Sequence, residues 1–160
     1  MARKLKVGFF SFTGDEGCMI TLLELLSDRL EETMGKLDIL YWRVLTPADW
    51  KGKEYDVAVI EGAVSVQQEV DKLKAVREHS KRVLAVGTCA CDGSPSNHRN
   101  SFDERRLGEI APVLKRFKYL DKVRPIGDFI MVDDKVAGCP VLEEPFLKVL
   151  GKYFKEFGVE

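Results

Sequence analysis

Residues 4–26 read KLKVGFFSFTGDEGCMITLLELL: an apolar run, a short polar turn and a second apolar run in close succession. The nearly continuous apolar character of 4–12 is typical of a strand that is buried on both faces in a parallel sheet. From Met19 to Met34 the apolar residues instead recur at helical spacing. The sequence therefore predicts a strand, then a turn containing two glycines, two carboxylates and one cysteine, and then a helix.

The same alternation continues through the first part of the chain. Further β-rich runs follow at 37–44, 56–62 and 82–88, and a helical pattern occupies 66–76. Strands that alternate with helices build a layered α/β domain. We therefore expect an α/β, flavodoxin-like fold, with a doubly wound, mostly parallel sheet and helices on both faces.

The pattern is looser in the second half of the chain. A polar loop leads to a short apolar helix at 110–117, and a hairpin is expected at 128–138 with a strand around 129–132. Apolar residues lie on one helical face from 142–157, so this last helix should pack back on the core. No repeat or linker interrupts the pattern, and the prediction is a single flavodoxin-like domain over residues 1–160.

Composition limits the classes of function. The chain has 160 residues, of which 45% are hydrophobic, and this is enough for one domain with a substantial core. Lys and Arg number 25 against 26 Asp and Glu, so the net charge of -1 provides no overall field to attract nucleic acid or an anionic membrane. No signal-peptide pattern opens the sequence, and no apolar run approaches the roughly 18 residues that cross a bilayer. We expect a cytoplasmic protein with no nucleic-acid partner and no direct membrane span.

Four cysteines lie in three distant places: Cys18, the pair Cys89 and Cys91, and Cys139. In a cytosolic protein of this size they indicate metal or redox chemistry more readily than structural disulfides, and small buried thiols are the simpler alternative. Cys18 and Cys89 follow predicted strands, where ligand sites form in open α/β sheets because loops from several strands meet there. Cys139 follows the strand expected near 129–132. All three positions can therefore meet at one edge of the sheet.

A glycine precedes each of these positions within two residues: Gly17, Gly87 and Gly138. Glycine permits the turns with positive φ and the close approach that a bulky inorganic group requires. Three loops that each supply one thiolate are what an iron–sulfur cluster needs. A tetrahedral zinc ion is the nearest alternative, but structural zinc usually takes paired ligands from C-x2-4-C knuckles, and the close pair here, Cys89 and Cys91, is one residue apart. The sequence has neither a P-loop nor a Rossmann fingerprint.

Four motifs, in the same order and at comparable positions, give the chain a resemblance to a known family. They are DEGC (15–18), IEGAV (60–64), GTCACDG (87–93) and AGCP (137–140). They resemble the proximal cluster site in the small subunit of nickel–iron hydrogenases and in its relative, the roughly 20 kDa cluster-bearing subunit of respiratory complex I. The resemblance spans almost the whole chain. Tandem cysteines typical of the complex I subunit are absent, which favours the hydrogenase branch.

The resemblance implies one [4Fe-4S] cluster on Cys18, Cys89 and Cys139, with Asp15 at the position where the family normally has its first cysteine. A carboxylate oxygen is a harder and less electron-releasing ligand than a thiolate, but it can bind iron. Three other outcomes stay open: a [3Fe-4S] cluster, a water on the fourth iron, or recruitment of Cys91 as the fourth ligand.

Three more residues are candidates for contacts around the cluster. Glu61 ends a strand and precedes a helix that begins near Ser65. It is either a carboxylate at the N-terminus of that helix or, as the resemblance implies, a group beside the cluster or the partner interface. Glu16 is either a solvated turn residue or a similar neighbour. His98 lies in a polar loop, where it either faces solvent or contacts the cluster sulfurs or the partner.

The resemblance implies electron transfer within a multisubunit nickel–iron hydrogenase, so the chain is an enzyme only as part of its complex. It would hold the proximal cluster and relay electrons between the nickel–iron centre of a large subunit and other iron–sulfur or flavin subunits. The paired C-x-x-C motifs that bind nickel are missing, and no nickel is expected in this chain. The alternatives are a complex-I-like quinone-reductase subunit and a non-catalytic flavodoxin-like binding module.

Overall fold

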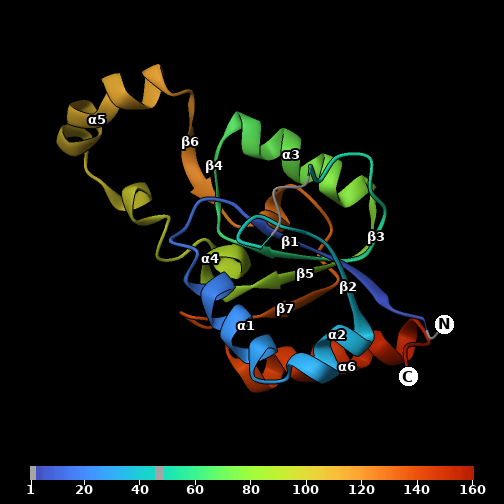
Figure 1. Ribbon diagram of the computed structural model, residues 1–160. Coiled ribbons are helices and arrows are strands. Elements are labelled where there is room, and N and C mark those ends of the chain that lie inside the picture. The colour runs from blue at the N-terminus through green and yellow to red at the C-terminus, as the bar shows by residue number, and fades with distance from the viewer. Residues whose placement is uncertain (1–2, 46–48) are drawn as a thin grey trace.

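A five-stranded parallel sheet forms the centre of this computed structural model, which describes residues 3–45 and 49–160 (Figure 1). Its strands are β1 (Leu5–Ser11), β2 (Leu37–Trp42), β3 (Tyr55–Glu61), β5 (Ser80–Val86) and β7 (Asp134–Val136). They lie in the order β2-β1-β3-β5-β7, and every neighbouring pair is parallel. The chain moves outward from β1 to β2 and then returns to β3 on the other side of β1, which is the doubly wound order of flavodoxin-like folds. The predicted fold class is confirmed.

Helices cover both faces of the sheet. Those on one face are α1 (Gly17–Ser27), α2 (Leu30–Lys36) and α6 (Glu143–Glu156), and those on the other are α3 (Gln67–Glu78) and α4 (Gly87–Asp92) (Figure 1). β3 is buried along its whole length, which explains its unbroken apolar sequence. Phe146 and Leu150 of the last helix pack on the core as predicted, and burying a side chain of this size contributes about 1.5–3 kcal/mol.

The amphipathic run 19–34 forms two helices rather than one. The break lies at Arg29, whose backbone is not helical (φ -120°, ψ 36°). In α2 the Thr33 hydroxyl donates to the Leu26 carbonyl oxygen at 3.1 Å. This bond satisfies one of the carbonyl groups that the end of α1 leaves without a helical partner, and it stabilises the bend.

The expected hairpin at 128–138 is wrong. Its first residue, Asp128, ends a short 3-10 helix, η2 (Ile126–Asp128), and the single strand β7 follows at Asp134–Val136, later than the expected 129–132. β7 pairs in parallel with β5, whose outer edge would otherwise present unpaired N–H and C=O groups. Sheet pairing with a distant strand therefore replaces the local hairpin.

Two elements outside the main sheet were not predicted. β4 (Val64–Val66) and β6 (Tyr119–Arg124) form an antiparallel pair beside it.

Between the 3-10 helix η1 (His98–Ser101) and β6 lies α5 (Glu104–Arg116), which starts earlier than the expected helix at 110–117. Asp103 caps it, because its carboxylate accepts the Arg106 N–H at 2.8 Å. None of the residues of α5 is buried in the described part of the chain, and Figure 1 shows this helix standing away from the sheet.

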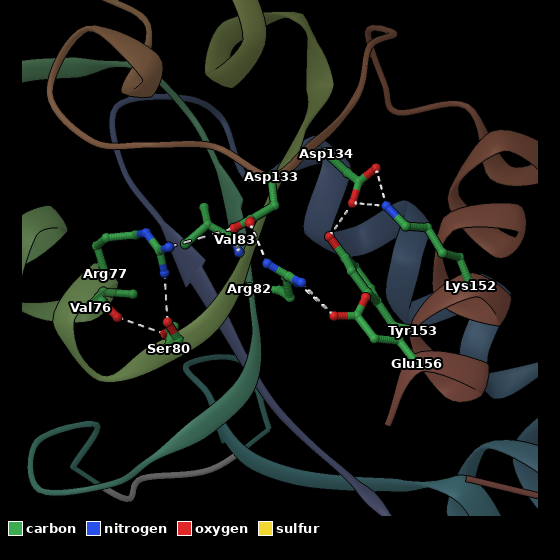
Figure 2. Close-up of polar contacts among 10 residues, drawn as sticks. All are labelled: Val76, Arg77, Ser80, Arg82, Val83, Asp133, Asp134, Lys152, Tyr153 and Glu156. Carbon is green, nitrogen blue, oxygen red and sulfur yellow. Dashed lines mark hydrogen bonds and ion pairs between the residues drawn. The ribbon is translucent and has the colours of Figure 1, made fainter. Parts of the chain in front are cut away.

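Charged side chains fasten β7 to its neighbours (Figure 2). The Asp133 carboxylate, just before the strand, accepts the Val83 N–H of β5 at 2.8 Å. The next carboxylate, Asp134, accepts the Tyr153 hydroxyl of α6 at 2.6 Å. The short strand is thus held between β5 and α6. This anchorage sets the starting point of the loop that contains Cys139.

Candidate functional site

Three loops meet at the carboxyl edge of the sheet. One is the turn between β1 and α1, the second is the start of α4 after β5, and the third is the segment 137–140 after β7. Together they border a cavity of about 180 Å³. Its lining residues are Gly14, Asp15, Gly17, Cys18, Glu61, Gly62, Thr88, Cys89, Gly138, Cys139 and Pro140. The structure thus brings the three cysteines and Asp15 of the predicted ligand set to one cavity.

Cys18 and Cys89 are the half-buried thiols of this group, and Cys139 is exposed. Burial raises the pKa of Cys18 to about 11, the Val141 backbone N–H opposes this rise, and the nearby Glu61, Cys89 and Cys139 add to it. Metal ligands must be deprotonated, and thiolates gathered beside a carboxylate repel one another. A positively charged metal centre would offset this repulsion, so the donor set fits a metal-containing group.

Two glycines allow the cysteine loops to approach closely. Gly87 has φ +80°, and a Cβ atom there would overlap the Cys18 sulfur. Gly138 has φ +130° and little room for a side chain beside the Pro140 carbonyl oxygen. The two loops are also joined directly, since the Thr88 N–H donates to the Gly138 carbonyl oxygen at 2.9 Å. Glycine therefore keeps these loops close around the cavity, as the sequence predicted.

The first loop achieves its turn differently from the expectation. The residue with positive φ is Glu16 (φ 61°), which is the N-cap of α1, and not Gly17. Gly17 instead leaves room for the Asp15 side chain, whose Oδ1 atom accepts the Gly17 N–H at 2.9 Å. Asp15 is exposed and lines the cavity, whereas Glu16 lies outside the lining. Asp15 thus orders the turn and faces the site at the same time.

Glu61 is a buried carboxylate in the wall of the cavity. Its side chain is at the end of β3, and its Oε2 atom accepts the Met19 N–H in the first turn of α1 at 3.1 Å. It therefore stabilises the N-terminus of α1. Its sequence position had instead suggested the helix that begins near Ser65. Within the described residues, the Oε1 atom has no hydrogen-bond partner. Burial raises the pKa of Glu61, and the Met19 N–H and the Ser11 hydroxyl partly oppose this rise.

The alternative fourth ligand, Cys91, lies elsewhere. It is buried in the apolar layer between the sheet and the helices of the opposite face, and its sulfur contacts the Ala85 carbonyl oxygen at 3.9 Å. Cys89 and Cys91 are on the same short helix α4, so their side chains leave it in different directions. The structure brings the first of the pair to the cavity and places the second in the core.

The loop with His98 contributes a different residue to the site. His98 is exposed in η1, with its ring against the edge of Phe102, and it lies outside the cavity. Ser96, which the sequence pattern did not single out, places its hydroxyl 3.2 Å from the Cys89 sulfur. A serine in a polar loop gives no sequence signal for such a contact, because the contact depends on how the loop folds over α4.

The spacing of the donors is a test of which metal group they fit. A tetrahedral zinc ion needs sulfur atoms about 3.8 Å apart, since each Zn–S bond is about 2.3 Å. Within residues 3–45 and 49–160, no group of three Cys, His, Asp or Glu side chains is arranged so that it could hold a single metal ion. Three thiols on separate loops around a glycine-lined cavity suit a larger group, to which each loop contributes one ligand.

Known proteins resemble the chain over most of its length. Residues 16–153 match the family described as NADH ubiquinone oxidoreductase, 20 Kd subunit. The vhu G chain of the F420-non-reducing hydrogenase of Methanocaldococcus jannaschii is 32% identical over 153 residues, and the match covers 85% of this chain and 51% of that protein. The iron-sulfur subunit of the F420-non-reducing hydrogenase of Archaeoglobus profundus is 28% identical, with 91% of this chain and 54% of that protein covered.

A solved structure shares the fold over nearly the full length of both chains. It is a chain of an NAD+-reducing [NiFe]-hydrogenase in the H2-reduced state, with a TM-score of 0.75, 27% identity, and coverage of 99% of this chain and 94% of that one. By contrast, the chain spans about half the length of the curated relatives described above. In the described part of the chain, no helix combines the length and the apolar character that crossing a membrane requires.

Proposed function

Since the chain belongs to the family of the 20 kDa subunit of NADH ubiquinone oxidoreductase, we propose that it is the electron-transfer subunit of a cytoplasmic, multisubunit nickel–iron hydrogenase. In this role it holds the proximal iron–sulfur cluster. The observation that carries the proposal is the meeting of three cysteine loops around one glycine-lined cavity at the carboxyl edge of the sheet. The hydrogenase relatives support this branch of the family over a complex-I-like quinone reductase.

Four residues would hold a [4Fe-4S] cluster: Cys18, Cys89 and Cys139 through sulfur, and Asp15 through oxygen. The cluster, when bound, supplies one-electron redox chemistry. The chain's own residues fix the positions of the ligands. Glu61 stabilises the first turn of α1, on which Cys18 lies, and the Thr88 contact with Gly138 joins the other two cysteine loops.

The partners follow from this role. A large subunit contributes the nickel–iron centre, and further iron–sulfur or flavin subunits exchange electrons with it through this chain. Cys139 is exposed at the edge of the cavity. A relay must lie close to the centre it serves, so we propose that the large subunit packs on this edge.

Substitution of each cysteine tests the ligand assignment. Cys18→Ser, Cys89→Ser and Cys139→Ser, each in the co-expressed complex, should lower the iron and acid-labile sulfide content or convert the cluster, because ligand binding and local folding are coupled. Cys91→Ala is the matched control and should retain both. Equal iron loss in Cys91→Ala, or an unchanged spectrum in Cys139→Ser, would overturn the assignment.

Two measurements separate the remaining functions. Nickel in the purified wild-type complex, together with hydrogen-dependent dye reduction, is expected for a hydrogenase. Iron–sulfur content with quinone reduction and no nickel would instead identify the complex-I-like function. If the wild-type chain, expressed with its partners, contains neither iron nor sulfide, the non-catalytic flavodoxin-like binding module remains as the function.

A further inference from the structure

In the described part of the chain, the Ser96 hydroxyl contacts the sulfur of a predicted cluster ligand, Cys89. Its Oγ atom lies 3.2 Å from the Cys89 sulfur and 3.3 Å from the Thr13 carbonyl oxygen. Thr13 and Cys89 also border an open depression that shares part of the cavity lining, and Ser96 lies in its wall. The hydroxyl thus bridges the turn after β1 and the start of α4, the two segments that contain the first two cysteines.

The loop that presents this hydroxyl is held from both sides. The Asn97 N–H donates to the Gly93 carbonyl oxygen at 2.8 Å, directly after Ser96. Asn100 makes two hydrogen bonds to the Val123 backbone of β6, at 2.7 and 2.9 Å. The position of the hydroxyl is therefore set by the backbone around it before any cluster binds.

A serine hydroxyl has one proton, so it cannot donate to both neighbours at once. The Thr13 carbonyl oxygen already accepts the Ala63 N–H at 2.8 Å. The Cys89 sulfur becomes an anionic acceptor when it binds iron, and hydrogen bonds to ionised acceptors are about twice as strong as those between neutral groups. With a cluster bound, the proton would therefore point to the sulfur.

Resting on the proposed function, we propose that Ser96 is a positioning residue that donates a hydrogen bond to the Cys89 thiolate and so raises the reduction potential of the cluster. Hydrogen bonds to cluster sulfurs are among the factors that set these potentials. The direction follows from charge. Reduction adds an electron to the cluster and its ligands, so a donor to the sulfur stabilises the reduced state more than the oxidised state.

Two pairs of variants isolate the hydroxyl. Ser96→Ala removes it, and Ser96→Thr retains it. Ser96→Val then matches the shape of Thr without the hydroxyl. Ser101→Ala is the control on the same loop, because the Ser101 hydroxyl donates to the His98 carbonyl oxygen, away from the cysteines. All are prepared as the co-expressed complex and analysed for iron, sulfide, the redox potential by electron paramagnetic resonance, and the Fe–S(Cys) stretching frequencies by resonance Raman.

We expect Ser96→Ala and Ser96→Val to retain iron and to shift the potential negatively. A change of up to about tenfold in the reduction equilibrium corresponds to up to about 59 mV for one electron. The Fe–S(Cys) frequencies should change in the same two variants. Ser96→Thr should stay near the wild type, and Ser101→Ala should not differ from it.

Two results would overturn the inference. Potentials and frequencies equal to wild type in both hydroxyl-free variants, with full iron, would mean that the hydroxyl donates to the Thr13 carbonyl. Iron loss in both, with normal loading of Ser96→Thr, would make Ser96 a residue needed for assembly. Neither result touches the proposed function, which fails separately if the wild-type complex contains no iron and sulfide.

Discussion

Asp15 and Cys18 stand on the same turn, and both line the cavity. One Asp15 oxygen accepts the Gly17 N–H. A carboxylate has several lone pairs, so this hydrogen bond leaves acceptor capacity for a metal. The same side chain can therefore order the turn and bind iron, and the two roles are separated by substitution.

Asp15→Cys should produce a cluster with four thiolate ligands and a shifted potential, one that is more resistant to the oxidative loss of one iron. A thiolate is a softer and more electron-releasing ligand than a carboxylate. Asp15→Ala should favour the [3Fe-4S] form. Electron paramagnetic resonance of the oxidised and reduced complexes distinguishes the two cluster types.

Glu16→Ala is the control for this experiment, since Glu16 is the next carboxylate along the chain and lies outside the cavity lining. It should leave the cluster type unchanged. If Asp15→Cys, Asp15→Ala and wild type share one cluster type and potential, Asp15 serves the turn alone, and water or another group completes the site.

Among the elements, β7 is short, and side-chain contacts keep it in place. Lys152 and Tyr153 of α6 both donate to the Asp134 carboxylate, at 2.7 and 2.6 Å (Figure 2). Burial alone would raise the pKa of Asp134, but the bonds from Lys152 and Tyr153 outweigh it and lower the pKa below its ordinary value of 3.8. The anchorage of the Cys139 loop therefore depends on an ionised carboxylate.

This pKa shift makes part of the stability depend on pH. Because the folded-state pKa is lowered, the contribution is complete above the unfolded value near 3.8 and is lost as the pH falls through the folded value. Asp134→Asn should lower the free energy of unfolding by about 1 kcal/mol at neutral pH. The difference from wild type should shrink below the unfolded pKa. Urea unfolding of both chains after iron removal, at several pH values, measures it.

Asp128→Asn provides the comparison, since Asp128 is an exposed carboxylate in η2. Its effect should be small at every pH. A gap between wild type and Asp134→Asn that persists unchanged in acid would show that the carboxylate is not the stabilising form.

In the whole molecule, the proposed partner surface and the proposed cluster site coincide at the carboxyl edge of the sheet. Cys139 and Asp15 are exposed there, and Leu142, a few residues after Cys139, is 57% exposed. Obligate interfaces typically bury more than about 2,000 Å² and are more apolar than other surfaces. An exposed leucine beside the cavity therefore belongs to the surface that the proposed large subunit would cover.

Two matched leucines test this placement. Leu142→Glu should reduce co-purification of the large subunit, because an interface disfavours a buried unpaired charge. Leu30→Glu is the control, since Leu30 is 58% exposed on α2, which leads to the opposite edge of the sheet. It should leave co-purification unchanged. Equal co-purification in both variants would place the partner on another surface.

The amino-acid sequence by itself determined the class of fold and predicted which thiols meet at the candidate site. Strands such as β3 are buried on both faces, and a continuous apolar run suits that environment. Such strands can therefore be recognised from the sequence alone. The position of Cys18 and Cys89 after such strands, beside glycines, likewise predicted their convergence, because parallel strands end at a common edge.

Only the tertiary structure decided which groups meet across the chain. Cys89 and Cys91 are one residue apart, yet one reaches the cavity and the other the core. Glu61 stabilises α1 rather than the helix that follows it, and Ser96 reaches the Cys89 sulfur from a loop without a recognisable motif. Such contacts depend on how separate elements pack and on the directions of individual side chains, and local sequence patterns encode neither.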